Sequence, residues 1–280
     1  FLKGDEIEIR TSVIPGAYGE SIVMRLLNPE TISVPFEQLG MEKRMKDLIE
    51  REIVKPNGML LNTGPTGSGK STTLYACMKK ISTPGVKIIT IEDPIEYHVK
   101  GIVQTQVDKK YTFLSGLRSA LRQDTDVIMV GEIRDEEVAR TAIDAALTGH
   151  FVFTTIHTNN AAGTFPRLVD LGVDPKVFPS AISIAMAQRL VRRLCDKCKK
   201  PLPLEGELKS RLMRVVEGLR DKSVLPPEPY VTYAAVGCPV CHNTGYKGRI
   251  GVFEAVVMDA ELDALLRTSP SERDIRAVQK

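Results

Sequence analysis

The sequence predicts an α/β fold built on a parallel sheet. Short apolar runs alternate with helical segments, and this order favours parallel strands connected by helices. One helical segment, residues 136–148, ends at Gly149, a residue that favours a helix C-terminus. A glycine-rich loop joins the first apolar run to another helical segment, residues 71–81. The four apolar runs are residues 59–61, 86–91, 127–130 and 151–156.

The composition is that of a globular protein with room for roughly two domains. Of the 280 residues, 42% are hydrophobic and 26% are charged. Lys and Arg number 38 against 35 Asp and Glu, whereas proteins that track nucleic acid carry a larger basic excess. No apolar run reaches the roughly 18 residues that cross a bilayer. The chain begins at Phe1 with neither a signal-peptide core nor an initiator Met and stops within an amphipathic segment, so we expect a piece of a longer protein. Its C-x-x-C pairs are more typical of metal ligands than of disulfides, which indicates a cytoplasmic protein.

A hairpin is predicted ahead of this core. Residues 6–13 alternate apolar and polar side chains, as a half-buried strand does. Pro and Gly at residues 15–19 break the pattern, and residues 21–27 resume it. We interpret the hairpin as the end of a domain that begins outside this chain. Residues 28–35 follow as a linker, and apolar side chains at helical spacing predict a helix at residues 42–54.

The glycine-rich segment matches the phosphate-binding pattern G-x-x-x-x-G-K-[ST] at every fixed position. Its glycines allow successive backbone N–H groups to point at a phosphate, and the following helix N-terminus adds partial positive charge. Lys70 is expected to reach the β- and γ-phosphates of ATP, and Ser71 to hold Mg²⁺. A chance glycine-rich turn is the alternative, but the flanking strand and helix argue against it. The predicted nucleotide-binding residues are Gly64, Pro65, Thr66, Gly67, Ser68, Gly69, Lys70, Ser71 and Thr72.

Polar side chains follow the other three apolar runs. Glu92 and Asp93 come after the second run, Glu132 after the third and His157 after the fourth. Because the carboxyl ends of parallel strands meet at one edge of a sheet, we expect these side chains to converge on the nucleotide. His150 precedes the fourth run, which places it at the far edge as a packed or interface histidine.

Each of these residues has a chemical role in the predicted site. Phosphoryl transfer needs charge neutralisation, an oriented water and positive charge near the γ-phosphate. Glu132 is expected to bind Mg²⁺ as a Walker B acid, directly or through water. Glu92 is the candidate for positioning the attacking water, Asp93 for orienting it or supporting the metal, and His157 for facing the γ-phosphate. For each acid the alternative is a helix N-cap or a solvated loop charge.

Four of the five cysteines form two C-x-x-C pairs. Four thiolates are the ligand set of a closed, structural zinc site. The gap between the pairs, residues 199–237, exceeds the short template spacing, and a redox pair is the alternative. Cys77 is expected in the core. A basic stretch at residues 189–200 is interpreted as a solvated face, with binding of an acidic group as the alternative. The predicted zinc ligands are Cys195, Cys198, Cys238 and Cys241.

The combination of motifs resembles the secretion and type IV pilus assembly ATPases along nearly the whole chain. The P-loop carries part of the resemblance; the combination of segments is highly specific, whereas no single segment is specific by itself. The further matching segments are IEDPIE at residues 91–96 (the family's Asp box), LRSALRQD at 117–124, GEIRD at 131–135, TGH at 148–150, IHTN at 156–159 (the His box), AQRLVRRLC at 187–195 and GYKGRIG at 245–251.

The resemblance implies a RecA-like core in a homo-hexameric ring, with nucleotide held between a smaller N-terminal domain and the core. It also gives a role to Arg10 and Arg25, because family arginines at these places reach the phosphates as the domains close. Without the resemblance both are solvent-exposed strand charges. Arg118, Arg122 and Arg134 match family arginines of the interdomain and intersubunit surfaces.

These expectations divide the chain into five regions. The first is the end of a small α+β domain, and the largest is the RecA-like P-loop NTPase core. The expected bounds are residues 1–30 for the C-terminal part of the N-terminal domain, 31–56 for a linker and helix, 57–190 for the core, 191–250 for the tetracysteine zinc-binding region, and 251–280 for the start of a C-terminal helical region.

The tetracysteine region resembles the extension ATPases of type IV pili and the type II secretion ATPases. We therefore expect an ATP-hydrolysing hexamer, with ATP, Mg²⁺ and Zn²⁺, that powers pilus extension. It would act on an inner-membrane platform protein at the cytoplasmic face, with no transmembrane segment and no nucleic-acid partner. The alternative is a type II secretion ATPase that drives pseudopilus assembly and protein export. Less favoured are a nucleic-acid-translocating motor, whose turnover would depend steeply on salt, and a regulator that binds ATP without hydrolysing it.

Overall fold

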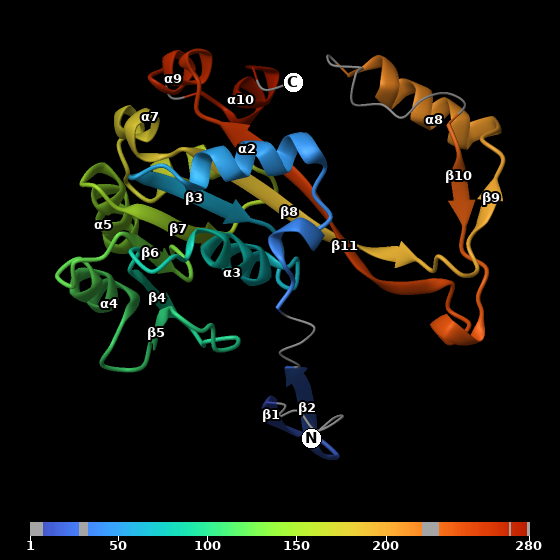
Figure 1. The fold of residues 1–280 in the computed structure, drawn as a ribbon, viewed down its shortest axis with the longest axis horizontal. Helices are drawn as coiled ribbons and strands as arrows, with labels where there is room; N and C mark the ends of the chain where they lie inside the picture. The colour runs from blue at the N-terminus through green and yellow to red at the C-terminus, as the bar shows by residue number, and fades with distance from the viewer. Residues whose placement is uncertain (1–7, 28–32, 220–229, 269, 279–280) are drawn as a thin grey trace.

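The computed structural model describes residues 8–27, 33–219, 230–268 and 270–278, without the side chains of Glu8, Arg25 and Leu27. A central sheet with helices on both faces forms the body, and an extension carries the cysteines (Figure 1). The strands are β1 (Glu8–Gly16), β2 (Gly19–Leu27), β3 (Gly58–Thr63), β4 (Ile88–Glu92), β5 (Val103–Gln106), β6 (Val127–Val130), β7 (Phe151–Ile156), β8 (Ile184–Leu194), β9 (Lys200–Leu202), β10 (Thr232–Ala234) and β11 (Tyr246–Val257).

The helices of the described part connect or cover these strands. The expected helix at residues 42–54 is present as α2, and that at residues 71–81 as α3. The α-helices are α2 (Lys43–Ile53), α3 (Lys70–Ile81), α4 (Phe113–Ala120), α5 (Glu136–Leu147), α6 (Thr164–Asp170), α7 (Phe178–Ala181), α8 (Gly206–Glu217), α9 (Ala260–Leu266) and α10 (Glu272–Val278). The 3-10 turns are η1 (Phe36–Gln38), η2 (Pro175–Val177) and η4 (Pro239–Cys241). No helix of the described ranges is both long enough and apolar enough to cross a membrane.

The central sheet has the strand order β11-β8-β3-β7-β6-β4-β5 in the described residues. Every neighbouring pair from β8 to β5 is parallel, and β11 alone runs antiparallel to its neighbour. The predicted α/β fold with a parallel sheet is therefore confirmed. Strands β3, β4, β6 and β7 are buried along their whole length, which explains why their sequences are continuous apolar runs.

Two hydrophobic cores lie on opposite faces of the sheet. Successive side chains of a strand point to opposite faces, so Met59 and Leu61 of β3 pack in one core while Leu60 packs in the other. The first core contains side chains of α4, α5, α6, α7, α9 and α10, and the second contains side chains of η1, α2 and α3. The two-sided cover holds the carboxyl ends of β3, β4, β6 and β7 at one edge.

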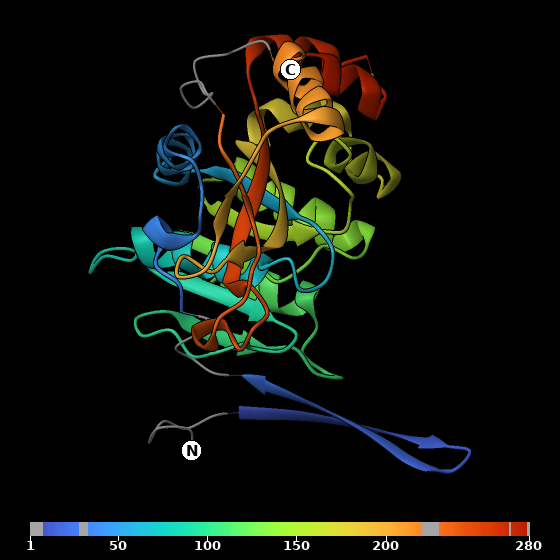
Figure 2. The same ribbon diagram turned by 90° about the vertical axis from the view of Figure 1, so that its right-hand side faces the viewer.

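The N-terminal hairpin stands away from the body (Figure 2). Its strands β1 and β2 pair antiparallel from Glu8↔Leu27 to Gly16↔Gly19. The turn is Ala17 and Tyr18, so it is shorter than the break expected at residues 15–19, whose other residues are paired in the strands. Both strands leave large apolar side chains exposed, among them Val13 and Met24. The register places Arg10 directly opposite Arg25.

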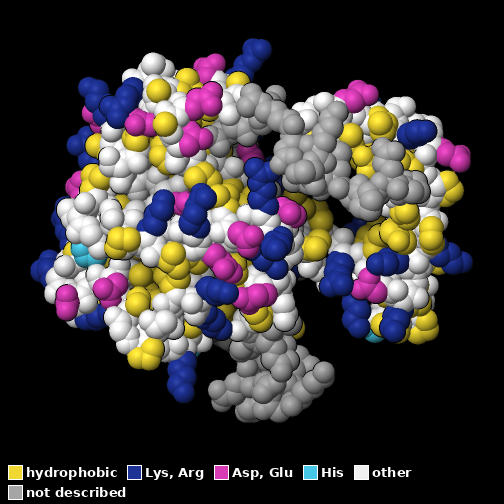
Figure 3. All heavy atoms as spheres, turned by 45° about the horizontal axis from the view of Figure 1, so that its top comes forward, with side chains coloured by type: hydrophobic (Ala, Val, Ile, Leu, Met, Phe, Trp, Pro, Cys, Tyr) yellow, Lys and Arg dark blue, Asp and Glu magenta, His cyan; other side chains and the backbone are white. Residues whose placement is uncertain are grey.

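Strands β8 and β11 continue beyond the sheet as an antiparallel ribbon, which carries β9, β10, α8 and the cysteine pairs (Figure 1). Strand β8 therefore crosses the expected boundary between residues 190 and 191, and β11 crosses the one between residues 250 and 251. The division into five regions stays a prediction. Lys and Arg are interspersed with Asp and Glu over the face seen in Figure 3, consistent with the net charge of +3.

Candidate nucleotide-binding site

The P-loop lies between the last residue of β3, Thr63, and the first residue of α3, Lys70. Gly64, Gly67 and Gly69 have φ values of 141°, 77° and 90°, a region that glycine adopts readily and other residues rarely do. These glycines let the loop wrap closely around the helix N-terminus, the arrangement that phosphate-binding loops use. Ser71 and Thr72 are half-buried in the first turn of the helix.

Lys70 is held against the loop itself. Its Nζ donates hydrogen bonds to the carbonyl oxygens of Gly64 (2.8 Å) and Pro65 (3.2 Å). Burial lowers the pKa of Lys70, and the nearby Glu132 carboxylate opposes that shift. The Lys70 ammonium therefore lies at the loop, and Glu132, which follows another strand, is close enough to favour its charged form.

Glu132 joins the side chains that follow three different strands. Its Oε2 lies 3.1 Å from Nε2 of His157, and its Oε1 accepts a hydrogen bond from Arg134. Arg134 also pairs with Asp93 at 3.3 Å. Burial opposes ionisation of Glu132, but the hydrogen bonds and charges of Arg134 and His157 outweigh it and keep the pKa below its usual value. The expected convergence of Asp93, Glu132 and His157 at one edge is therefore present, and Glu132 is a carboxylate fit to bind a cation.

Glu92 lies in a different environment. It is the last residue of β4, only 3% exposed, and its carboxylate accepts hydrogen bonds from Tyr75, Thr90 and Gln104. Burial raises the pKa of Glu92, and the three hydrogen bonds act against that rise. The structure therefore places Glu92 in a buried network beside α3, separate from the Glu132 cluster.

Tyr75 was missed by sequence reasoning, although it is fully buried in α3 one turn after Ser71. A buried phenol hydroxyl needs a hydrogen-bond partner, so a tyrosine in this helix indicates a buried acceptor, which is Glu92 in the structure.

Arg10 of the hairpin contacts the segment that follows β4. Its Nη2 donates to the carbonyl oxygen of Ile95 at 2.7 Å, and its Nη1 lies 3.3 Å from the Glu96 carboxylate. The side chain of Arg25, the other predicted hairpin arginine, lies outside the described residues. Arg10 is thus connected to the nucleotide edge through the chain that begins at Glu92, a contact that its position in the sequence alone does not reveal.

His150 and the predicted surface arginines lie elsewhere. Nδ1 of His150 is 3.2 Å from the carbonyl oxygen of Ala145, at the amino end of β7 and away from the P-loop. Arg118 is exposed on α4, and Arg122 follows that helix.

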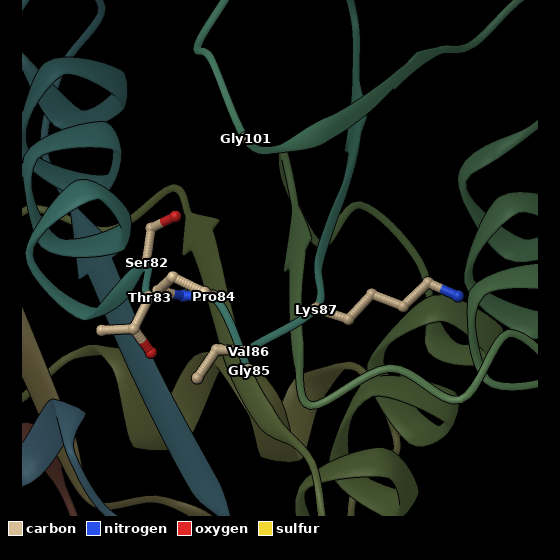
Figure 4. A pocket seen from close by; sticks show the side chains of 7 residues that line it. All are labelled: Ser82, Thr83, Pro84, Gly85, Val86, Lys87 and Gly101. Carbon is tan, nitrogen blue, oxygen red and sulfur yellow. The ribbon is translucent and has the colours of Figure 1, made fainter.

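Two hollows lie near the amino ends of the strands. The first, of about 540 Å³, is formed by residues 82–87 and Gly101 (Figure 4). The second, of about 550 Å³, shares Thr83 and Val86 with it and extends to Phe151. Since the P-loop is at the carboxyl edge of the sheet, neither hollow belongs to the nucleotide site.

The four paired cysteines form a second candidate site. Their Sγ atoms all lie within 4.8 Å of one another, with 3.9 Å between Cys195 and Cys238 and 3.8 Å between Cys198 and Cys241. A tetrahedral zinc with Zn–S bonds of about 2.3 Å holds its sulfurs roughly 3.8 Å apart. All five cysteines of the chain are free, so no disulfide competes with this arrangement. The residues present fit a four-thiolate metal ion.

Backbone N–H groups point at the sulfurs of this cluster. Burial opposes ionisation of the Cys241 thiol, but N–H donors of Cys238 and Gly245 lower its pKa to about 6. Such donors stabilise thiolates, as a bound cation requires. In the adjoining basic stretch, Arg193 and Lys199 both pair with Asp196, so part of that charge is neutralised locally.

A P-loop between a buried parallel strand and a helix, with acids at the neighbouring strand ends, defines a P-loop nucleotide-binding protein. The chain belongs to the family described as "Type II/IV secretion system protein", whose model matches residues 1–280. The resemblance seen in the sequence is thereby confirmed.

Curated relatives agree with this assignment. "Type II secretion system protein E" of Pseudomonas aeruginosa is 46% identical over 274 residues, which are 97% of this chain and 53% of the relative. "Type II secretion system ATPase E" of Vibrio cholerae is 43% identical over 272 residues, or 96% of this chain and 52% of the relative. The chain therefore spans about half the length of the curated relatives it matches.

Solved structures confirm the RecA-like secretion ATPase fold. The pilus retraction motor PilT with bound ADP superposes with a TM-score of 0.67 and 28% identity, over 97% of this chain and 66% of the other. The ATPase DotB of Legionella pneumophila superposes with a TM-score of 0.63 and 24% identity, over 97% of this chain and 63% of the other.

Proposed function

We propose that this chain is the motor part of a type II secretion ATPase. It binds Mg-ATP at the P-loop, hydrolyses it, and drives pseudopilus assembly and protein export. The observation that carries the proposal is the position of Lys70 at the P-loop beside the ionised Glu132, which Arg134 and His157 hold at the same edge. The relatives named for type II secretion favour this function over pilus extension, which the sequence alone had favoured.

The side chains of the site divide the work of phosphoryl transfer. The P-loop N–H groups and Lys70 bind the phosphates, and Ser71 and Glu132 hold Mg²⁺, which neutralises phosphate charge when bound. His157 lies against Glu132, and its proposed role is to face the γ-phosphate when nucleotide is bound. Glu92 is the candidate for orienting water, and this role requires that its network with Tyr75 opens, because the carboxylate is buried in this structure.

Arg10 and Arg25 supply positive charge when the N-terminal domain closes over the nucleotide. Closure would transfer Arg10 from Ile95 and Glu96 to the phosphates. The four cysteines hold one structural zinc, because a closed four-ligand site leaves no position for a substrate. We further propose a homo-hexamer at the cytoplasmic face of the inner membrane, which acts on a platform protein there.

ATP hydrolysis by the purified chain, compared with its Lys70→Ala variant, tests the chemistry. We expect loss of nucleotide binding or turnover in the variant, because the phosphates lose their fixed positive partner. Hydrolysis at the wild-type rate in Lys70→Ala would remove the basis of the proposal.

Deletion of the gene in its host separates the two cellular functions. Loss of secreted protein with intact surface pili supports secretion. Loss of pili with normal secretion returns the function to pilus extension. Complementation with the Lys70→Ala variant should fail in either case, while copurification with a membrane platform supports both.

A further inference from the structure

A buried glutamine lies directly beneath the P-loop. Gln188 is 3% exposed in β8, the strand that pairs with β3, and it follows Ala187, the register partner of Thr63. Because β3 ends where the P-loop begins, Gln188 sits at the level of the loop itself. Gln188 is not one of the charged residues that we have assigned to the nucleotide site.

The side-chain amide joins the two elements that flank the loop. Its Oε1 accepts a hydrogen bond from Nδ2 of Asn62 in β3 (3.3 Å) and one from Oγ1 of Thr73 in α3 (2.8 Å). Asn62 and Thr73 are both fully buried, so water does not compete for these bonds. One acceptor thus fixes the strand before the loop relative to the helix after it.

The first and last glycines of the loop rest against the same residue. A Cβ atom on Gly64 would lie 2.3 Å from the carbonyl oxygen of Gln188, and one on Gly69 would lie 2.9 Å from its Nε2. Both distances are too short for a carbon atom at van der Waals contact. The P-loop is therefore seated on Gln188 at both ends, and only glycine permits the approach.

Polar groups around this contact are not fully satisfied by the described residues. Oδ1 of Asn62 and Oγ of Ser68 are buried without a hydrogen-bond partner. Buried polar atoms of this kind are uncommon in native proteins and mark places that a ligand or an ordered water completes. The Gln188 network is therefore poised at the inner side of the loop whose outer side faces the phosphates.

We propose that Gln188 is a positioning residue for nucleotide binding. Through its contacts with both ends of the P-loop and with β3 and α3, it fixes the conformation of the loop. This inference rests on the proposed function, since it assumes that the loop binds the phosphates of ATP and ADP. A glycine-rich loop has many accessible conformations, and a fixed support reduces the entropy lost when N–H groups order around a phosphate. Because the support acts on binding of the phosphates, its loss should raise the Kd for both nucleotides more than it lowers kcat.

The test uses Gln188→Met, which keeps the length of the side chain but removes its hydrogen bonds. We expect the Kd for Mg-ADP and Mg-ATP to rise about tenfold or more, with kcat at saturating ATP within about threefold of the wild type. Ser183→Ala is the matched control, because Ser183 is buried just before β8 and away from the loop. It should alter the melting temperature of the free protein without altering either Kd.

Gln188→Glu provides a second measurement should the Met variant fail to fold. A protonated Glu resembles Gln in shape and neutrality, whereas its carboxylate puts negative charge beneath the phosphate site. Burial raises the pKa of such a group, so the ratio of variant to wild-type Kd should fall as the pH is lowered from about 8 to about 6. A purely structural role predicts a ratio near one at every pH.

The outcomes separate this inference from the proposed function. If the wild type binds neither ADP nor ATP, the proposed function fails. If the wild type binds them and both Gln188 variants bind with the same Kd, the positioning role is overturned. A loss of thermal stability in Gln188→Met with unchanged Kd likewise overturns it.

Discussion

Glu92 ends β4 and Glu132 follows the neighbouring strand β6, yet their environments shift their pKa values in opposite directions. Burial raises the pKa of Glu92, while Arg134 and His157 keep that of Glu132 low despite its partial burial. Pairs of acids separated in this way commonly divide acid, base and metal-binding work in an active site. Here the ionised Glu132 suits cation binding. Glu92 suits a role in orienting water that begins only after its carboxylate leaves the buried network.

Glu132→Gln should keep nucleotide binding and stop hydrolysis, because the shape of the side chain remains and its charge is lost. Since the folded-state pKa of Glu132 is lowered, its ion pairs stabilise the protein above the unfolded pKa of about 4.5 and are lost as the pH falls below it. The variant should therefore lose less stability than the wild type between about pH 5 and pH 3. ADP titration, steady-state hydrolysis and urea unfolding measure the three effects. Normal binding together with a normal rate would refute the metal-site assignment.

Glu92→Gln should stabilise the protein at neutral pH while it abolishes turnover. A raised folded-state pKa means that the folded protein binds the proton more tightly, so stability falls as the pH rises through and above the unfolded value of about 4.5. The amide removes this charge and fits the network: its Oε1 can accept from Thr90 and Gln104, and its Nε2 can donate to the hydroxyl oxygen of Tyr75.

We expect a gain of about 1 kcal/mol in the free energy of unfolding at pH 7, the size of a typical stabilising substitution. Urea unfolding at pH 5 and pH 8 should show the gain growing with pH. A variant that is destabilised and still hydrolyses ATP normally would show that Glu92 is a structural acid with no part in the chemistry.

For single residues of the site, the sequence predicted those that lie at strand ends and missed those that contact the site from other helices and strands. The P-loop, Glu132 and His157 follow from motif and strand order, because parallel strands end at one edge. Tyr75 and Gln188 contact the site through packing between α3, β4 and β8, which no local pattern encodes. The buried state of Glu92 likewise depends on Tyr75, a partner 17 positions away.

Among the elements, the hairpin is the one to which we assign a role that requires movement. Its strands pair with each other and leave apolar side chains exposed, while Arg10 touches the segment after β4. The alternation of apolar and polar residues sufficed to predict both strands. Strands β5, β8, β9, β10 and β11 were not predicted as strands. Strand β5 is a half-exposed edge, β9 and β10 have three residues each, and the long strands β8 and β11 run into the exposed ribbon, where their apolar pattern is interrupted.

Arg10→Ala should reduce turnover by about tenfold or more while the Kd for ADP stays within about threefold of the wild type. The reason is that Arg10 acts on the phosphates only after closure, whereas the P-loop binds ADP without it. Arg10→Lys should restore little activity, since the planar fork of paired donors is lost. Thr11→Ala is the control, because Thr11 is the adjacent, exposed residue of the same strand. Near wild-type hydrolysis by Arg10→Ala would make Arg10 a surface charge.

The whole molecule consists of a sheet with two cores and an extension built on one ribbon. Strand β8 belongs to both: residues 184–188 are buried in the sheet, and the residues that follow are mostly exposed and lead to Cys195. The same strand thus supports the P-loop through Gln188 and begins the tetracysteine cluster. The C-x-x-C pairs predicted the cluster from sequence, but not that it is joined so directly to the nucleotide site.

Loss of the metal should unfold the extension and spare the sheet. Chelation, or Cys238→Ser, should reduce the metal content from one zinc per chain to none, because three thiolates bind zinc far less tightly than four. Hydrogen exchange should then lose protection at Gly237, Cys238 and Gly245, whose N–H groups donate to the cysteine sulfurs, while β3 and β7 remain protected. The Kd for ADP should change by less than about threefold, since residues 184–188 of β8 are held by β3 independently of the metal.

Cys77→Ala is the matched control, because Cys77 is buried in α3, its pKa is raised to about 12, and its removal should release no zinc. Loss of ADP binding in step with zinc release would instead show that the sheet and the extension fold as one unit, and four titratable thiols without metal in protein purified free of chelator would refute the zinc site.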